Sequence, residues 1–248
     1  MLLTDIQLLK EMHCNFVRGS HYPQDPRFLD LCDEQGILIW SEGIGWQHTD
    51  EHLNDPAFLN AQKTHLQEMV QAGYNHPSIF VWGIINESES HKVESRDGYQ
   101  ALLGTLRELD ASRPVTYATC HPYDDLNYDL VDIISINRYP GWYEGELEGI
   151  PAVLDKLSAH LEEEGFGNKP LIISEIGAGA IPGFHDRHHK RWTEEYQRDL
   201  VDAVITHLFE TRNRACGLAL WMFADFRSTE ALPKPLGRPP GFNNNGCL

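Results

Sequence analysis

The sequence predicts an α/β fold, an incomplete (β/α)8 TIM barrel, and three observations lead to this prediction. The 248 residues alternate short β-branched apolar runs with longer amphipathic stretches, which is typical of repeated βα units. Seven of the runs are apolar throughout, as expected for strands of a parallel sheet that is covered on both faces. The GxGxxG phosphate fingerprint of a doubly wound sheet is absent, so a barrel is favoured over an open sheet.

The elements are expected in a regular order along the chain. An amphipathic helix opens the sequence, because the apolar positions of MLLTDIQLLKEMHC recur at helical spacing. The expected strands are residues 14–20, 36–42, 78–87, 114–120, 131–140, 170–177 and 216–226. The expected later helices are residues 26–35, 56–73, 99–110, 152–164 and 193–212. Seven strands are one short of a closed barrel, so we expect one domain, residues 1–248, that lacks its first strand and last helix.

Composition excludes some classes of partner. The chain has 20 Lys and Arg against 37 Asp and Glu, and its formal charge of -17 disfavours nucleic acid and anionic membrane surfaces. No run approaches the roughly 20 apolar residues of a membrane span. Five cysteines without a CxxC pair predict neither a disulfide framework nor a zinc ribbon. Free thiols favour a bacterial cytoplasmic location, and a secreted or periplasmic one stays open because an upstream segment is expected.

Polar side chains at strand ends are the candidates for chemistry, because barrels carry their reactive groups there. The apolar run SIFVWGII ends in Asn86 and Glu87, and PLIIS ends in Glu175. A single Glu after a strand is more often a solvated loop residue. Two facing carboxylates, however, are what glycoside cleavage requires, and a separation of about 5 to 5.5 Å makes the reaction a retaining one.

Several neighbours of the two carboxylates suit a sugar site. Arg18 offers a cation, Tyr139 and Tyr143 offer phenol donors, and Trp221 offers an aromatic floor for the apolar face of a sugar. Each is weak evidence alone, since Trp221 also suits a core position and Tyr143 a loop contact.

Five segments carry a family resemblance. NFVRGSHYPQDPRFLDLCDEQGILIW, HPSIFVWGIINES, ISINRYPGWY, PLIISEIGA and LWMFADF together resemble the catalytic barrel of glycoside hydrolase family 2, the β-galactosidase and β-glucuronidase family. They cover nearly the whole chain in the family's order. The resemblance implies a retaining double displacement through a covalent glycosyl-enzyme, in which Glu175 is the nucleophile and Glu87 the acid/base. It implies no cofactor, although some β-galactosidases of the family bind divalent cations.

The resemblance also implies roles for the surrounding residues. Asn86 matches the Asn that contacts the sugar 2-hydroxyl, and Tyr139 matches the Tyr that hydrogen-bonds the nucleophile. Arg18 and His21 match the VRxSHYP stretch that supports the site. Trp221 matches the Trp that floors the sugar subsite.

The sugar specificity depends on the last residues of the chain. NRYxGWY, WxFADF and a late Asn-x-Lys-Gly are closest to the β-glucuronidase branch, where the Asn and Lys hold the uronate carboxylate. This sequence keeps Asn243 but has Asn245 in place of the Lys, and a neutral amide lacks the charge-assisted hydrogen bond. Expected substrates are therefore β-glucuronides, β-galactosides, or β-galacturonides held by another cation such as Arg227 or Arg238.

Alternatives to this interpretation are few. His185, His188 and His189 are spaced like metal ligands, but the adjacent Arg and Lys favour a solvated loop, and no metal site is predicted. His121 with Asp124 and Asp125 is a weaker metal candidate. The GxSxG elbow of a serine hydrolase is absent.

A different functional class stays open: an inactive fragment or non-catalytic carbohydrate-binding barrel. Without the first strand of the barrel, its second and eighth strands would expose unpaired edges and favour opening or self-association. A carbohydrate is the expected partner in either case, and a full-length parent protein could form a homo-oligomer.

Overall fold

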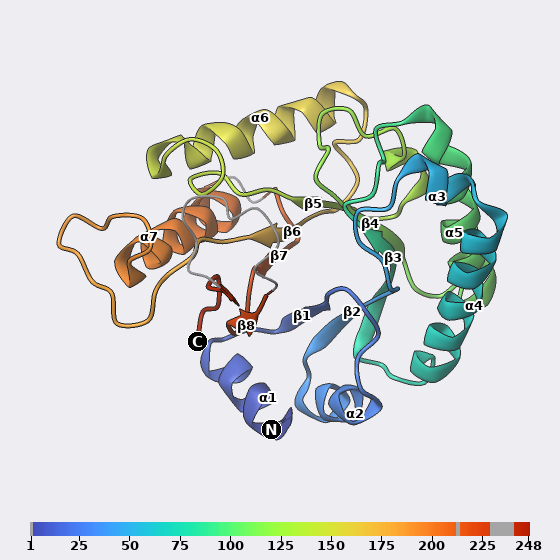
Figure 1. Cartoon of the computed structure of the whole chain (residues 1–248), viewed down its shortest axis with the longest axis horizontal. Helices are drawn as coiled ribbons and strands as arrows, with labels where there is room; N and C mark the ends of the chain where they lie inside the picture. The colour runs from blue at the N-terminus through green and yellow to red at the C-terminus, as the bar shows by residue number, and fades with distance from the viewer. Residues whose placement is uncertain (1, 212–213, 229–240) are drawn as a thin grey trace. The chain divides into compact units, whose positions relative to one another are not determined.

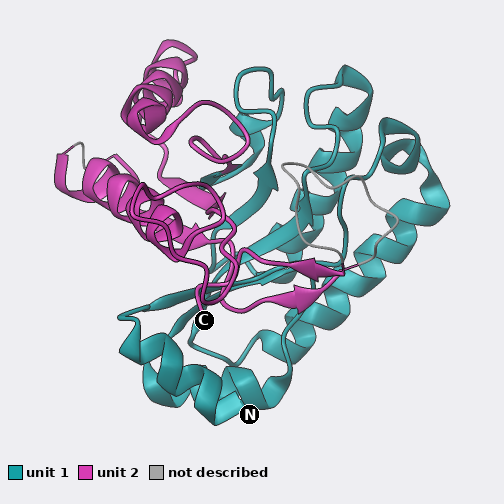
Figure 2. Cartoon of the chain, turned by 60° about the vertical axis from the view of Figure 1, so that its left-hand side comes forward, with its two compact units in different colours: residues 1–136 teal, residues 137–248 magenta. Residues whose placement is uncertain are grey.

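The computed structural model describes residues 2–211, 214–228 and 241–248, which fall into two compact units, residues 1–136 and 137–248 (Figure 2). Each unit is an alternation of strands and helices. The prediction of an α/β fold with parallel strands is confirmed, and all seven expected strands are present.

Unit 1 contains five parallel strands that pair in chain order. The strands are β1 Phe16–Gly19, β2 Leu38–Glu42, β3 Ile79–Asn86, β4 Val115–Thr119 and β5 Ile134–Asn137, whose last residue opens unit 2. The helices are α1 Leu2–Glu11, α2 Pro26–Gln35, α3 Asp50–Asn54, α4 Pro56–Gly73 and α5 Arg96–Leu109, with single 3-10 turns at Val93–Ser95 and Tyr128–Leu130. Helices α2, α4 and α5 cover the outer face of these strands (Figure 1).

The sequence explains where the helices of unit 1 begin. Asp25 and Asp55 each precede a proline, and their carboxylates accept the N–H of Arg27 and Ala57, respectively. A proline in the first helical turn loses no hydrogen bond, so the pair of residues gives a defined start. Short α3 was not expected, because five residues are too few to show a helical period.

Close packing inside the sheet depends on Gly83 of β3. A Cβ atom at this position would lie 2.1 Å from Nε1 of the Trp40 indole, which is fully buried. Any side chain at residue 83 would therefore displace Trp40. Because the Arg18 guanidinium lies over the Trp40 ring at 4.7 Å, this packing also supports the polar groups at the ends of the strands.

Unit 2 pairs two parallel strands and adds a short antiparallel pair. The strands are β6 Leu171–Ile176, β7 Gly217–Leu220, β8 Phe226–Arg227 and β9 Phe242–Asn243, and the helices are α6 Ile150–Glu163 and α7 Glu194–Ile205. A 3-10 turn, Leu147–Gly149, precedes α6, and a π-helical turn, Thr206–Thr211, continues α7. Helices α6 and α7 pack against each other (Figure 1).

The seventh strand is shorter than expected. Residues 216–226 form one apolar run, yet β7 ends at Leu220. The Met222 N–H donates to the Asn245 carbonyl at 2.8 Å instead of continuing the ladder with β6. The expected extension to residue 226 is therefore wrong, because the last residues of the chain take over this backbone bond.

Asp110 stabilises the start of β4 through a buried network. Its carboxylate accepts the Trp82 indole N–H at 2.9 Å, the Arg113 Nη1 at 2.7 Å and the Ser112 N–H at 2.8 Å. Burial acts to raise the pKa of the Asp110 carboxyl, but the bonds from Ser112, Trp82 and Arg113 outweigh burial and hold that pKa well below its ordinary value. Its contribution is thus present above the ordinary Asp pKa and is lost as pH falls through the lower, folded value.

Asp110→Ala is expected to lower the free energy of unfolding by about 3 kcal/mol at pH 7, because it leaves the buried Trp82 indole N–H and the Arg113 Nη1 without their acceptor. Urea unfolding of parent and variant measures this difference. Asp129→Ala, which removes an exposed ion pair with Arg96, is the matched control and should cost less than about 1 kcal/mol. An equal loss in both variants would contradict the assignment, as would a difference that does not shrink as pH falls below the ordinary Asp pKa.

Candidate active site

Glu87 and Asn86 lie together at the carboxyl end of β3. Asn86 is the last residue of the strand and only 1% exposed, and Glu87 follows it with a positive φ of 45°. Glu87 keeps one backbone bond to the next strand, from its N–H to the Ala118 carbonyl at 2.9 Å. This bond fixes where the Glu87 side chain leaves the sheet.

A buried ion network joins three of the expected site residues in unit 1. Glu42, the last residue of β2, is fully buried and accepts Arg18 Nε at 2.8 Å and Arg18 Nη2 at 3.1 Å. His21 Nδ1 lies 2.8 Å from the same carboxylate, and Arg18 Nη2 donates to Asn86 Oδ1 at 2.7 Å. Arg18 thus holds both the Glu42 carboxylate and the amide oxygen of Asn86.

Glu42 is the residue of this network that the sequence analysis missed. Burial acts to raise the pKa of the Glu42 carboxyl, but the charge of Arg18 and the hydrogen bond to His21 outweigh it, and the pKa lies below its ordinary value. Glu42 is therefore an anion that holds Arg18 in place. The sequence could have indicated Glu42, because this residue ends an apolar run in the same way as Glu87 and Glu175 do.

Two further side chains that the sequence analysis missed approach Glu87. Trp46 Nε1 donates to Glu87 Oε2 at 3.3 Å, and Gln47 Nε2 donates to the same oxygen at 3.5 Å. Both residues lie in the segment after β2, which has no apolar periodicity to mark it.

Unit 2 places Glu175 on β6 beside Tyr139. Glu175 is 6% exposed, and the Tyr139 hydroxyl donates to its Oε2 at 2.7 Å. The backbone fixes this pair, because the Arg138 N–H donates to the Glu175 carbonyl at 2.9 Å. The Tyr143 ring lies 5.0 Å from the Tyr139 ring, centroid to centroid, and is half exposed. A buried carboxylate with one phenol donor is well placed to act as a nucleophile of fixed orientation.

Trp221 and the two late asparagines belong to the same unit as this pair. The Trp221 N–H donates to the Ile176 carbonyl at 2.8 Å, one residue beyond Glu175, and a Cβ at Gly177 would lie 2.3 Å from the Trp221 oxygen. Asn243 and Asn245 are 8% and 1% exposed, and the Asn245 N–H lies 3.3 Å from Asn243 Oδ1. In unit 2, the Tyr139 hydroxyl therefore binds Glu175 directly, and the Trp221 backbone pairs with the residue after Glu175. Asn245 is linked to the same segment through the bond from the Met222 N–H to its carbonyl.

Arg227 and Arg238 are the two cations that the sequence offers as alternative uronate ligands. Arg227 lies on β8 and is exposed. Arg238 lies outside the described residues.

In each of the two histidine groups named in the sequence, histidines contact carboxylates within their own unit. His185 Nδ1 is 2.8 Å from Glu195 Oε1, and His189 contacts Asp199, so these histidines tie their loop to α7. Hydrogen bonding to Glu195 raises the pKa of His185. In the second group, His121 lies 3.9 Å from Asp124, whereas Asp125 turns inward to accept the Tyr117 hydroxyl at 2.6 Å.

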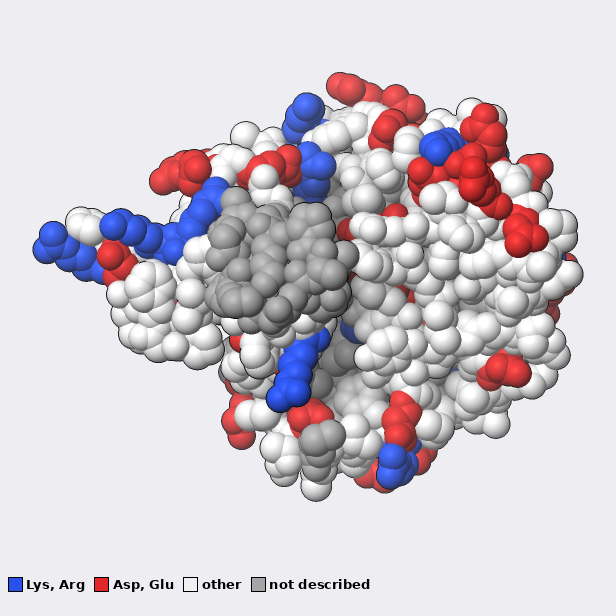
Figure 3. Space-filling model, viewed as in Figure 1, with Lys and Arg blue, Asp and Glu red and all other residues white. Residues whose placement is uncertain are grey.

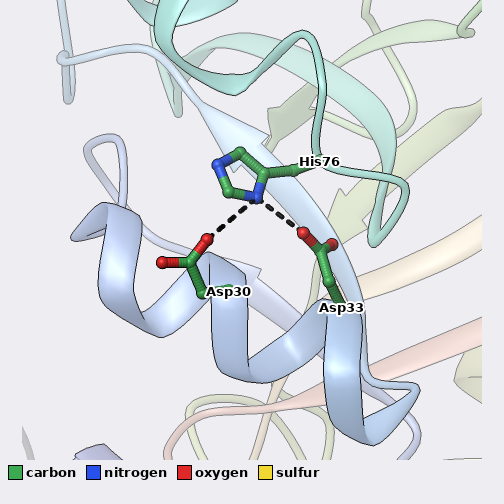
Figure 4. A group of neighbouring side chains, drawn as sticks. All are labelled: Asp30, Asp33 and His76. Carbon is green, nitrogen blue, oxygen red and sulfur yellow. Dashed lines mark hydrogen bonds and ion pairs between the residues drawn. The ribbon is translucent and has the colours of Figure 1, made fainter.

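Among the described residues, one group brings three metal-ligating atoms within 4.8 Å of one another: Asp30 and Asp33 on α2, and His76 (Figure 4). Asp33 accepts the Ser78 N–H at 2.8 Å, and its other oxygen lies 2.7 Å from His76 Nδ1. These bonds tie α2 to the residues before β3, at the opposite end of that strand from Glu87. We therefore interpret Asp30, Asp33 and His76 as a structural contact, because residues at the amino ends of barrel strands contribute to stability.

Asp and Glu side chains lie in several separate groups over the visible face rather than in one patch (Figure 3). None of the helices in the described ranges combines the length and apolar character that a bilayer crossing requires.

Comparison with known proteins places this geometry in a family. Residues 1–234 match the model of the glycosyl hydrolases family 2, TIM barrel domain. A β-glucuronidase of Sus scrofa is 33% identical over 251 residues, which cover 97% of this chain and 37% of the relative. A β-glucuronidase of Streptococcus agalactiae is 33% identical over 263 residues, which cover 98% of this chain and 44% of the relative. The chain therefore spans about two fifths of the length of these relatives.

Solved structures show the same similarity. A β-galacturonidase of Eisenbergiella tayi bound to galacturonate superimposes with a TM-score of 0.91 at 36% identity, covering 99% of this chain and 43% of that chain. A β-glucuronidase of Bifidobacterium dentium complexed with coumarin-3-O-glucuronide has a TM-score of 0.89 at 29% identity, covering 100% and 40% of the two chains.

Proposed function

Because the chain belongs to glycosyl hydrolase family 2 and contains its TIM barrel domain, we propose that the protein is a retaining β-glycosidase. Its reaction is a double displacement through a covalent glycosyl-enzyme. The observation that carries the proposal is the buried Glu175, held by the Tyr139 hydroxyl at 2.7 Å at the end of β6. A carboxylate in this setting is suited to attack an anomeric carbon.

Glu87 is assigned the complementary role of acid and then base. In the first step it protonates the glycosidic oxygen while Glu175 forms a bond to the anomeric carbon. In the second step it takes a proton from the water that releases the sugar. The network of Glu42, Arg18 and Asn86 supports this assignment, because it fixes a donor amide one residue before Glu87.

For the substrate we propose a terminal β-linked glucuronide, galacturonide or galactoside. The names of the relatives favour the two uronides. The amide at Asn245 keeps the neutral galactoside open, since the residue carries no charge to pair with a carboxylate. A bacterial cytoplasmic location is part of the proposal, and the cysteine pattern of the sequence, which contains no CxxC pair, supports it.

Hydrolysis of 4-nitrophenyl β-glucuronide, galacturonide, galactoside, glucoside and mannoside tests the proposal. The assay uses this chain and the longest protein that its gene encodes. Release of the β-anomer of the sugar, followed by proton NMR, is the expected result. Binding of a sugar without hydrolysis in both preparations would favour the alternative of a non-catalytic carbohydrate-binding barrel.

Asn245→Lys is expected to raise the ratio of glucuronide to galactoside kcat/KM by about tenfold, because a charge-assisted bond to the uronate adds about 1.5 kcal/mol. The measurement is the ratio of the two kcat/KM values in parent and variant. Asn244→Lys adds the same charge one residue away and is the matched control. An unchanged ratio in Asn245→Lys, or an equal rise in both variants, would remove Asn245 from the specificity site.

A further inference from the structure

The indole of Trp46 is unusually exposed for its size and touches the expected acid/base. The side chain is 49% exposed, yet its Nε1 points to Glu87 Oε2 at 3.3 Å. Gln47 Nε2 adds a second donor to the same oxygen at 3.5 Å. Two consecutive residues thus direct both of their side-chain donors to one carboxylate oxygen.

The backbone holds these two residues against the end of β3. The Asn86 N–H donates to the Gly45 carbonyl, and the Gln47 N–H donates to the Asn86 carbonyl, both at 2.9 Å. Trp46 and Asn86 form an isolated parallel bridge between these bonds. The segment of residues 45–47 therefore continues the pairing of β2 with β3 up to Glu87.

Gln47 and Glu87, whose side chains contact each other, both have a left-handed backbone conformation. Gln47 has a φ of 54° and Glu87 a φ of 45°, and neither residue is a glycine. Such conformations are unfavourable for residues with a Cβ and are retained where the surrounding structure requires them, often at functional sites. Here they turn a Gln amide and a Glu carboxylate toward each other.

We propose that Trp46 and Gln47 are positioning residues for Glu87 and decide which of its oxygens carries the proton. Two N–H donors on Oε2 favour a lone pair there and leave the proton on Oε1. In the first step that proton moves from Oε1 to the glycosidic oxygen as the bond from this oxygen to the anomeric carbon breaks and Glu175 bonds to the same carbon. In the second step Glu87 takes a proton from the attacking water. The inference rests on the proposed role of Glu87 as acid/base.

Leaving-group dependence tests the inference, because protonation matters only when the leaving group is poor. Trp46→Phe keeps an aromatic ring and removes the N–H, and Gln47→Leu removes the second donor. The double variant is compared with the parent on methyl and 2,4-dinitrophenyl β-glycosides of the sugar that the parent hydrolyses best. We expect kcat/KM to fall by about tenfold on the methyl glycoside and by less than about twofold on the dinitrophenyl glycoside.

Two controls separate the possible outcomes. Tyr74→Phe removes a polar group from an equally exposed ring at the amino end of β3 and should leave both substrates unchanged. An equal loss on both substrates in the double variant, or no loss on either, would overturn the inference. If Glu87→Gln itself shows no leaving-group dependence, or the parent hydrolyses neither glycoside, the proposed function fails and the inference with it.

Discussion

Glu175→Gln is expected to lower kcat by at least about 10⁴-fold on every β-glycoside that the parent hydrolyses, because an amide cannot form the covalent glycosyl-enzyme. The loss should not depend on the leaving group, since the missing group attacks carbon rather than assisting departure. Steady-state kinetics on nitrophenyl and methyl glycosides measure it. Gln is close in size to Glu and can still accept the Tyr139 hydroxyl, so the fold should be preserved, as circular dichroism can check.

Tyr139→Phe is the matched control for this prediction. It keeps the ring and its contact with Tyr143 but removes the hydrogen bond to Glu175. A loss of about tenfold to a hundredfold is expected, since the nucleophile is still present and only one bond that orients it is gone.

The products of chemical rescue add a sharper criterion. In Glu175→Ala, azide can attack only from the vacated face and should give the α-glycosyl azide, the inverted product. Near-parental activity in Glu175→Gln would show that another group is the nucleophile, as would a β-glycosyl azide from Glu175→Ala.

The strands could be predicted from the sequence because each is a continuous apolar run between polar boundaries. The seven expected strands all exist, and two of the helices, α2 and α4, begin where Asp-Pro pairs give a clear start, at Pro26 and Pro56. The seventh strand was expected to continue through residues 221–226, and this expectation was wrong because backbone pairing is not visible in the sequence. Apolar character alone does not show which backbone groups pair, and there the partner of Met222 is Asn245, far along the chain.

The candidate site was predictable where a polar residue ends an apolar run. Arg18, Asn86, Glu87 and Glu175 were found in this way. Glu42 obeys the same rule and was passed over, because a sequence does not show that a Glu is fully buried against an Arg.

Trp46 and Gln47 illustrate what sequence patterns leave out. They lie in GIGWQ, a glycine-containing segment without periodicity, and their relation to Glu87 depends on two left-handed backbone conformations. Neither conformation is favoured by the residue that adopts it, so local propensity gives no indication of them. The bonds between residues 45–47 and Asn86 connect positions about forty residues apart, which only the folded chain brings together.

Glu87→Gln is expected to lower kcat/KM by about 10²- to 10⁴-fold on methyl β-glycosides and far less on 2,4-dinitrophenyl β-glycosides, because only a poor leaving group needs the proton that Glu87 supplies. With the activated substrate the covalent intermediate should accumulate, since the variant lacks the base for hydrolysis. Azide needs no base, so it should restore turnover and give the β-glycosyl azide, with the configuration of the substrate. Glu89→Gln is the matched control: Glu89 follows the same strand but pairs with Lys92 at 2.9 Å and accepts the Asp50 N–H at 2.7 Å. If Glu89→Gln and Glu87→Gln lost activity alike, or azide failed to restore turnover in Glu87→Gln, the acid/base assignment would be wrong.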